Sequence, residues 1–377
     1  MFGLKCRLIE PKCLFLRRHK PHNTPNIEMQ TSCQDLLMRL IATPRTSRNE
    51  GDAADMLQAH LADLGLQPRR EANNLWCVAP GHDDARPTLL LNAHIDTVRP
   101  AASWQRDPFS PTLEGDRLYG LGSNDDGASL VCLLEAFRTM CARERTYNMV
   151  WLASAEEEVS GRDGVERALP LLPRIDVALV GEPTGMQPAV AEKGLMVLDC
   201  VAHGRAGHAA RDEGDNAIYH AVDDIQRLRH LTLPRQSALL GPVRLTTTIV
   251  SAGTQHNVVP DECRFTVDVR SNECYTNAEL LDIVRATIGA DVTPRSTRLS
   301  SSRIDLDHPL VRRAVALGRT PFGSPTLSDQ ALMPFPSMKM GPGQSARSHT
   351  ADEFICLSEL HAAVTDYVAM LDGLCLA

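Results

Sequence analysis

The chain has 377 residues, more than a single domain usually contains, and 43% of them are hydrophobic, which is enough for two cores. Its formal net charge of -8 gives no basic surface for nucleic acid, so we expect no nucleic-acid partner. No apolar run approaches the roughly 18 residues that a membrane-spanning helix needs, so we expect no membrane partner either.

From residue 32 onward, the apolar periodicities of helices and strands alternate, which is the pattern of an α/β layer. The predicted elements are helices at 33–41 and 49–64, strands at 74–79 and 88–93, a helix after Asp126, a strand at 148–155, a helix, and a strand at 177–181.

A different pattern begins after the chain-breaking segment PTGMQP. It predicts a strand at 194–202, a helix at 216–228, strands at 243–252 and 263–270, a helix at 277–288 and a short strand near Val292. This βαββαβ order is that of a ferredoxin-like domain. The first pattern returns near Ser300, with helices at 310–317 and from Ser358. We therefore predict an α/β domain at 32–187 plus 301–377, interrupted by an inserted domain at 188–300.

The N-terminal segment and the cysteines bear on the location of the protein. Residues 1–28 are rich in basic side chains but lack the apolar core and cleavage site of a signal peptide, so we expect residues 1–31 to form a poorly ordered extension. Met29 is a candidate for the natural start of translation. The eleven cysteines are an odd number without a CxxC pair, which is typical of reduced thiols and predicts a cytoplasmic protein.

Three predicted strands end in groups that can bind a metal. The apolar run of LLLNAHIDTV ends in His94 and Asp96, NMVWLASA runs into the three glutamates at 156–158, and VALVG runs into Glu182. In open α/β sheets ligands bind beyond the carboxyl ends of the strands, so these groups can meet in space. His94 and Asp96 are two apart and share one side of the strand, where the imidazole can bind a metal while the carboxylate holds its other nitrogen.

Two glycine-containing segments complete the candidate site. YGLGSNDDGAS delivers Asp125 and Asp126 just before an apolar helix, where taken alone they are a simple acidic helix cap. GPGQSARSHTADE places His349 in a loop, where a lone histidine is usually a surface residue. Neither segment is a dinucleotide fingerprint or a phosphate loop, and the chain has no G-x-S-x-G elbow of a serine hydrolase.

These motifs resemble a known family. HID, GLGSND-D, the triple glutamate, GEPT, GRAGH and SHT occur in the order found in the co-catalytic zinc aminoacylase and carboxypeptidase group, which includes acetylornithine deacetylase and succinyl-diaminopimelate desuccinylase. The resemblance runs from about residue 33 to the end. The stretches AEKGLMVLDC, AGTQHNVVPD and SARSHTADE are most similar to acetylornithine deacetylases of the Bacteroidetes type.

The resemblance implies a zinc-peptidase-like catalytic domain with two divalent ions, Zn²⁺ or alternatively Co²⁺ or Mn²⁺. It implies that His94 and Glu182 hold one ion, that Glu158 and His349 hold the other, and that Asp125 bridges them. The residue after the bridging aspartate is usually small or apolar in the family, and here it is Asp126. Either carboxylate can be the bridge, and the alignment favours Asp125.

The resemblance also assigns catalytic roles. Glu157 is the implied general base, and Asp96 is implied to orient His94. His208 of GRAGH corresponds to the histidine that, in family dimers, reaches into the partner's active site to support the oxyanion. The resemblance thus implies that the inserted domain is a dimerisation or lid domain and that the protein is a homodimer. Taken alone, the sequence favours a solvent-facing loop position for His208. Asn257 and Arg270 match family positions that hold the substrate. Without the resemblance, Arg270 would be read as a charged residue at a strand edge.

The implied reaction removes a short acyl group from the α-nitrogen of an amino acid. The expected substrate is N-acetylornithine or N-succinylornithine, giving ornithine in arginine biosynthesis. The alternatives are a dipeptidase, an aminoacylase or a succinyl-diaminopimelate desuccinylase of the same family. A non-catalytic binding protein is disfavoured, because the implied base and metal ligands are all present.

Overall fold

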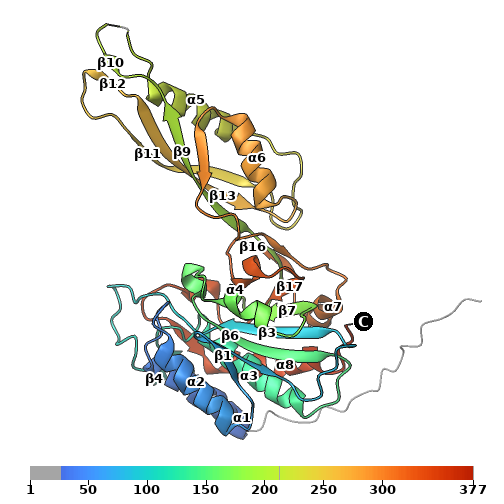
Figure 1. Cartoon of the computed structure of the whole chain (residues 1–377). Coiled ribbons are helices and arrows are strands. Elements are labelled where there is room, and N and C mark those ends of the chain that lie inside the picture. Colours follow the sequence, from blue (N-terminus) through green and yellow to red (C-terminus); the bar gives the residue numbers. More distant parts are fainter. Residues whose placement is uncertain (1–26, 212, 377) are drawn as a thin grey trace, which may run out of the picture.

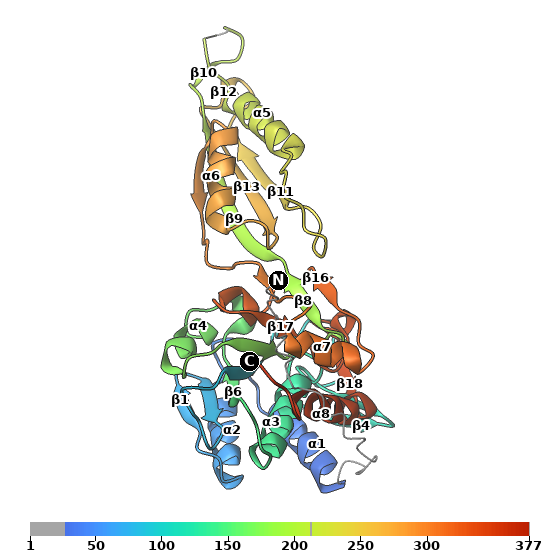
Figure 2. The same cartoon turned by 90° about the vertical axis from the view of Figure 1, so that its right-hand side faces the viewer.

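The computed structural model describes residues 27–211 and 213–376, which form a larger α/β domain and a smaller domain that projects from it (Figure 1). The smaller domain comes from one continuous stretch of sequence, and the larger one from the segments before and after it (Figure 2). The predicted α/β fold with an inserted domain is confirmed. In these two ranges no helix is long and apolar enough to cross a membrane.

A nine-stranded sheet forms the centre of the larger domain. Its strands are β1 (Arg69–Glu71), β2 (Asn74–Val78), β3 (Thr88–His94), β6 (Asn148–Ser154), β7 (Val177–Val180), β8 (Ala189–Glu192), β15 (Ser302–Arg303), β16 (Phe322–Ser324) and β17 (Ser337–Lys339). They lie in the order β1-β2-β6-β3-β7-β17-β8-β15, and β16 pairs with β8. Strands β6, β3, β7 and β17 are parallel, so their carboxyl ends meet at one edge of the sheet.

Both faces of the central strands are covered, which explains their uninterrupted apolar sequences. Along β3, Leu89 and Leu91 belong to one core, while Leu90 packs into a separate core on the other face. The first core is shared with α1 (Ile27–Ala42), α2 (Gly51–Asp63), α3 (Gly127–Cys141), α7 (Pro309–Ala316) and α8 (Leu357–Leu371). The second core is shared with α4 (Val165–Ala168) and the last residue of the 3-10 helix η3 (Asp329–Leu332).

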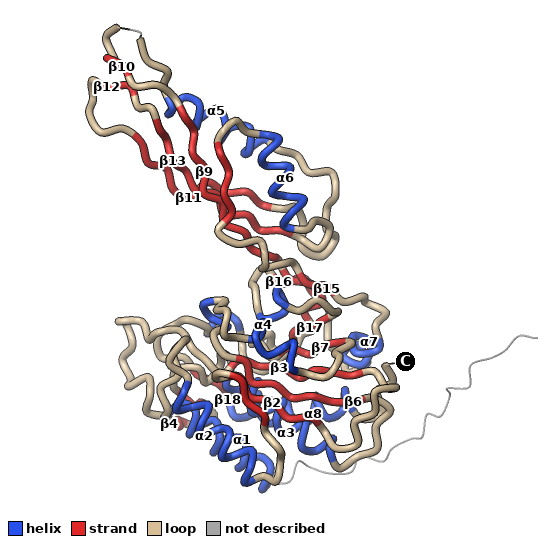
Figure 3. Tube along the Cα trace, in the orientation of Figure 1, coloured by secondary structure: helices blue, strands red, loops and turns tan. Residues whose placement is uncertain are grey.

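The inserted domain consists of β9 (Gly194–His203), α5 (Ala217–His230), β11 (Arg244–Ala252), β13 (Glu262–Ser271), α6 (Asn277–Thr287) and β14 (Asp291–Pro294). Its strands form an antiparallel sheet in the order β11-β13-β9-β14. Each helix connects two strands that flank a third, and the two helices pack against one another on the sheet (Figure 3). The predicted βαββαβ arrangement is therefore confirmed.

Several short elements had no signal in the sequence. They are β4 (Thr112–Glu114), β5 (Arg117–Tyr119) and β18 (Phe354–Cys356), which form one small sheet; β10 (Gly207–His208) and β12 (Val258–Val259), which form another; and the 3-10 helices η1 (Glu157–Val159), η2 (Leu169–Leu171) and η4 (Ser345–Arg347). Strands of two or three residues are too short to display a period of two, so hydrophobic patterning does not reveal them.

Two predicted boundaries differ from the structure. β8 lies after residue 188, where we expected the inserted domain, yet it pairs within the large sheet, so the inserted sheet begins at Gly194. The PTGMQP segment is thus a turn inside the larger domain. Helix α1 begins at Ile27, within the expected N-terminal extension, while the rest of that prediction, at residues 1–26, lies outside the described residues.

Candidate metal centre

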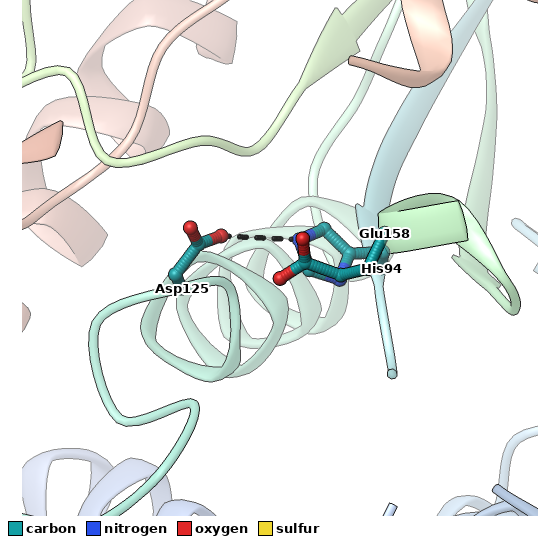
Figure 4. Close-up of side chains that lie close together, drawn as sticks. All are labelled: His94, Asp125 and Glu158. Carbon is teal, nitrogen blue, oxygen red and sulfur yellow. Dashed lines mark hydrogen bonds and ion pairs between the residues drawn. The ribbon is translucent and has the colours of Figure 1, made fainter. Parts of the chain in front are cut away.

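The candidate site lies at the carboxyl ends of three adjacent strands. His94 is the last residue of β3, Glu157 and Glu158 begin η1 just after β6, and Glu182 follows β7. Because the sheet order is β6-β3-β7, these strand ends are neighbours, as the sequence predicted. Asp125 joins them from the loop before α3, and Figure 4 shows its carboxylate facing the His94 ring beside Glu158.

The His94 ring is held in a defined orientation. Its Nδ1 lies 2.9 Å from the backbone carbonyl oxygen of Asp96 and 3.5 Å from the Asp96 Oδ1 atom. A proton on Nδ1 is therefore donated chiefly to the carbonyl, which leaves Nε2 as a free donor atom for a metal. That Nε2 points to the Asp125 Oδ1 atom, 3.2 Å away.

The buried Asp96 carboxylate also organises the segment after β6. It accepts hydrogen bonds from the backbone N–H groups of Glu157, at 3.0 Å, and Glu158, at 3.2 Å, and from the Ser47 hydroxyl at 2.7 Å. Burial acts to raise the pKa of Asp96, but the hydrogen bond and charge of His94 outweigh it and hold that pKa below its usual value. Asp96 thus positions the two glutamates as well as the histidine.

Asp125 lies between two histidines that are distant in sequence. Its Oδ1 faces His94, and its Oδ2 lies 3.7 Å from His349 Nε2, which in turn is 2.8 Å from Glu158 Oε2. One carboxylate therefore faces both halves of the cluster, which is the position that a bridging ligand requires. The His349 side chain is 56% exposed, so this side of the cluster is open to solvent.

Two sets of ligand atoms are compact enough to hold a cation. The atoms of His94, Asp125 and Glu158 all lie within 4.8 Å of one another, and so do those of His94, Glu157 and Glu182. Imidazole nitrogen and carboxylate oxygen are the donors that zinc and related divalent ions accept. The two sets share His94, whose free Nε2 can bind only one ion. A second ion has the nearby Asp125, Glu158 and His349 side chains as its candidate ligands.

The charges in the cluster are unbalanced without a cation. Burial raises the pKa of Glu157 well above its usual value, and the neighbouring carboxylates of Glu182 and Asp329 add to the rise. Burial likewise raises the pKa of Glu182, partly offset by the Lys339 ammonium. Crowded carboxylates favour protonation unless positive charge is supplied, and divalent ions supply it.

A family model that describes peptidase family M20/M25/M40 matches residues 90–372. The chain belongs to this family. It is therefore an enzyme of the M20 metallopeptidase and amidohydrolase group, and a hydrolase.

Curated relatives of this M20 chain carry two names. An acetylornithine deacetylase of Proteus mirabilis (strain HI4320) is 26% identical over 93% of this chain and 99% of its own length. An acetylornithine deacetylase of Myxococcus xanthus is 29% identical over 86% of this chain and 92% of its own length. A succinyl-diaminopimelate desuccinylase of Parvibaculum lavamentivorans is 28% identical over 68% of this chain and 71% of its own length.

Solved structures show the same M20 fold. The aminopeptidase PepT of Bacillus cereus superposes with a TM-score of 0.73 at 20% identity, over 91% of this chain and 98% of that one. A dinuclear metal-binding M20 peptidase of Bacillus subtilis superposes with a TM-score of 0.68 at 16% identity, over 92% of this chain and 98% of that one. At these identities the likeness establishes the fold of the M20 chain.

Asp126 differs from Asp125 in its surroundings. It is fully buried at the start of α3 and belongs to neither set of clustered ligand atoms. Burial raises the pKa of Asp126 to about 8, and the adjacent Asp125 carboxylate contributes to the rise. The geometry therefore favours Asp125 as the bridge and gives Asp126 no place among the ligands of the M20 site.

Sequence reasoning assigned no chemical role to several buried groups that surround the site. Asp329 accepts hydrogen bonds from Asn92, at 3.0 Å, and Ser154, at 2.5 Å, and burial raises the pKa of Asp329 to about 6. Lys339 forms an ion pair with Glu192 at 3.1 Å, and both side chains are fully buried. No motif marks these residues, and only their charge within apolar segments distinguishes them.

Three predicted residues of the inserted domain do not reach the metal cluster of their own chain. His208 is in β10, beside the loop that holds Asn257, at the end of the inserted domain farthest from the large sheet (Figures 1 and 2). Arg270 is near the other end of β13, and its side chain is paired with Asp268 at 2.8 Å. Their roles stay predictions, as do the assigned roles of the clustered residues.

Proposed function

We propose that this M20 enzyme removes a short acyl group from the α-nitrogen of an amino acid, with N-acetylornithine or N-succinylornithine as substrate and ornithine as product. The convergence of His94, Asp125, Glu158, Glu182 and His349 around Glu157 carries the proposal. The names of its full-length relatives support the substrate class.

Two divalent ions, Zn²⁺ or alternatively Co²⁺ or Mn²⁺, are the proposed cofactors. His94 and Glu182 would hold one, Glu158 and His349 the other, and Asp125 both. When bound, such ions supply Lewis acidity and lower the pKa of a bound water to about 7. The M20 relative of Bacillus subtilis described as dinuclear and metal-binding supports this assignment.

Glu157 is the proposed general base. Its backbone N–H is fixed by Asp96, and its side chain lies among the ligand atoms of His94 and Glu182. Glu157 would take the proton of the attacking water and later give it to the leaving α-amine. Asn257 and Arg270 are proposed to hold the substrate, since an arginine binds both oxygens of a carboxylate.

His208 of the partner subunit is the proposed hydrogen-bond donor to the oxyanion, because the same chain's His208 is in β10, at the far tip of the inserted domain. A donor of this kind typically lowers the barrier by about 2.7–4 kcal/mol. The edge strand β11 supports a homodimer: its Ile249 is 56% exposed and its Val250 is 57% exposed. Apolar side chains on an open sheet edge favour pairing with a second copy.

The test measures the ornithine released from matched N-acetyl- and N-succinylornithine. Metal-loaded protein is compared with chelator-stripped protein. N-succinyl-diaminopimelate and a dipeptide are tested separately as alternative substrates, and hydrolysis of each is measured by its own amine product. We expect metal-dependent release from one of the two ornithine derivatives. Release only from the desuccinylase substrate or only from the dipeptide would overturn the proposed substrate while leaving the M20 hydrolase intact.

A further inference from the structure

A buried acidic side chain that has no assigned role lies shortly after His349. Glu353 is 2% exposed, and both of its carboxylate oxygens accept hydrogen bonds from the backbone of one loop, residues 120–126 (loop 120–126). The N–H groups of Asn124 and Asp125 each donate to Oε1 at 2.8 Å, and the N–H of Gly122 donates to Oε2 at 2.9 Å. This loop carries Asp125.

The Glu353 carboxylate has backbone N–H groups of loop 120–126 as its hydrogen-bond donors among the described residues. The ion pairs of the described residues include no lysine or arginine partner for Glu353, and the nearby Arg45 donates instead to the carbonyl oxygens of Leu40 and Gly122. Converging backbone N–H groups form a strong anion site. Conversely, three buried N–H groups rely on one carboxylate, and a buried donor without an acceptor is unfavourable.

A second connection joins the same two parts of the chain. The Asn124 side chain accepts a hydrogen bond from the Gln344 backbone N–H at 2.9 Å and donates to the Gln344 carbonyl at 3.2 Å. The Gly120 N–H also donates to the Glu353 carbonyl at 3.0 Å. Loop 120–126 and the segment that carries His349 therefore form one connected unit.

We propose that Glu353 is a positioning residue of the metal centre. By holding loop 120–126 it fixes the Asp125 carboxylate between His94 and His349, and it thereby raises the affinity for the pair of ions; this inference rests on the proposed function. A carboxylate is required because both of its oxygens only accept hydrogen bonds. A glutamine at 353 would turn an NH₂ group toward one of the three N–H donors.

The experiment titrates metal-free protein with Co²⁺ and records both the visible absorption spectrum and the heat of binding. Glu353→Gln should bind Co²⁺ about 10–100-fold more weakly than the wild type, the usual loss for a residue that supports a metal ligand. Its visible spectrum should also change, because the Asp125 oxygens move. Glu135→Gln is the matched control, since Glu135 is buried on α3 but pairs with Arg138 at 2.6 Å, and it should match the wild type.

Hydrogen exchange in the metal-free protein gives a second readout. The amides of Gly122, Asn124 and Asp125 should exchange slowly in the wild type and faster in Glu353→Gln. Should that variant fail to fold, Glu353→Asp replaces it, because it keeps the charge but is one methylene shorter and should also bind Co²⁺ more weakly. Wild-type affinity and spectrum in either folded variant would overturn the role of Glu353. A wild-type protein that binds no Co²⁺ would instead overturn the proposed function, and this inference with it.

Discussion

Replacing Lys339 by methionine should strongly destabilise the catalytic domain. The ammonium donates to Thr326 twice, to the carbonyl and the hydroxyl oxygen, both at 3.0 Å, and lies 3.1 Å from Glu192 Oε2. In the Lys339→Met variant the Glu192 carboxylate stays fully buried, with Ser328 as its remaining hydrogen-bond partner. Breaking a buried ion pair from one side costs about 3–5 kcal/mol of unfolding free energy.

The double variant separates the cost of the unpaired charge from the value of the pair. In Lys339→Met with Glu192→Leu no charge is left behind, and buried pairs replaced by apolar side chains are often close to neutral. We therefore expect the double variant to lie within roughly 2 kcal/mol of the wild type, and to be more stable than Lys339→Met alone.

Urea unfolding of metal-free protein, followed by tryptophan fluorescence, measures these differences. Trp76, Trp104 and Trp151 are the three tryptophans of the chain and all belong to the catalytic domain, so the signal reports that domain separately from the inserted one. The reasoning is refuted if Lys339→Met costs less than about 1 kcal/mol, or if the double variant is as unstable as the single one.

Three further outcomes are expected. Glu157→Gln should keep its metal content but lose about 10²–10⁴-fold in kcat, measured by metal analysis and turnover; near-normal turnover would exclude Glu157 as the base. Asp329 has a raised pKa of about 6, so the folded state favours its protonated form, and this group lowers stability as pH rises from about 4 to 6. Because Glu157 and Glu182 also have raised pKa values, Asp329→Asn should weaken the pH dependence rather than abolish it, and it should gain about 3 kcal/mol at pH 7 in urea unfolding of metal-free protein. An unchanged pH profile would contradict the assignment. Mixed His208→Ala and Glu157→Gln proteins should regain activity through hybrid dimers, and no recovery despite proven subunit exchange would argue against a donor from the partner subunit.

The predictable parts of the molecule are those whose residues carry a local signal. The βαββαβ domain was found because its helices and strands are long enough to show their periods, as β9 does with its alternation of buried and half-buried side chains. The gathering of His94, Glu158 and Glu182 followed from one rule, that parallel strands end at the same edge. The first inference needs only the local periods of the elements, and the second needs only their order along the chain.

The rest depends on contacts that no local pattern encodes. Glu353 and Asp125 are 228 residues apart, and nothing in the segment HTADE distinguishes a glutamate that binds a distant loop from one that faces solvent. Ser47 reaches Asp96 from a turn between two helices for the same reason. Asp125 and Asp126 are adjacent and chemically identical, and only the folded structure separates them: Asp125 lies beside His94, whereas Asp126 belongs to neither set of clustered ligand atoms.

Two buried carboxylates of the M20 site hold different segments of the chain in place. Asp96 and Glu353 each accept several backbone N–H groups, so each fixes a segment of chain rather than a single side chain. Asp96 fixes the segment of Glu157 and Glu158, and Glu353 fixes that of Asp125. Because ordering the chain is the main cost of building a precise site, two buried carboxylates that order these segments before any ion arrives lower the cost of binding. The affinity for metal is therefore expected to depend on residues that need not touch it.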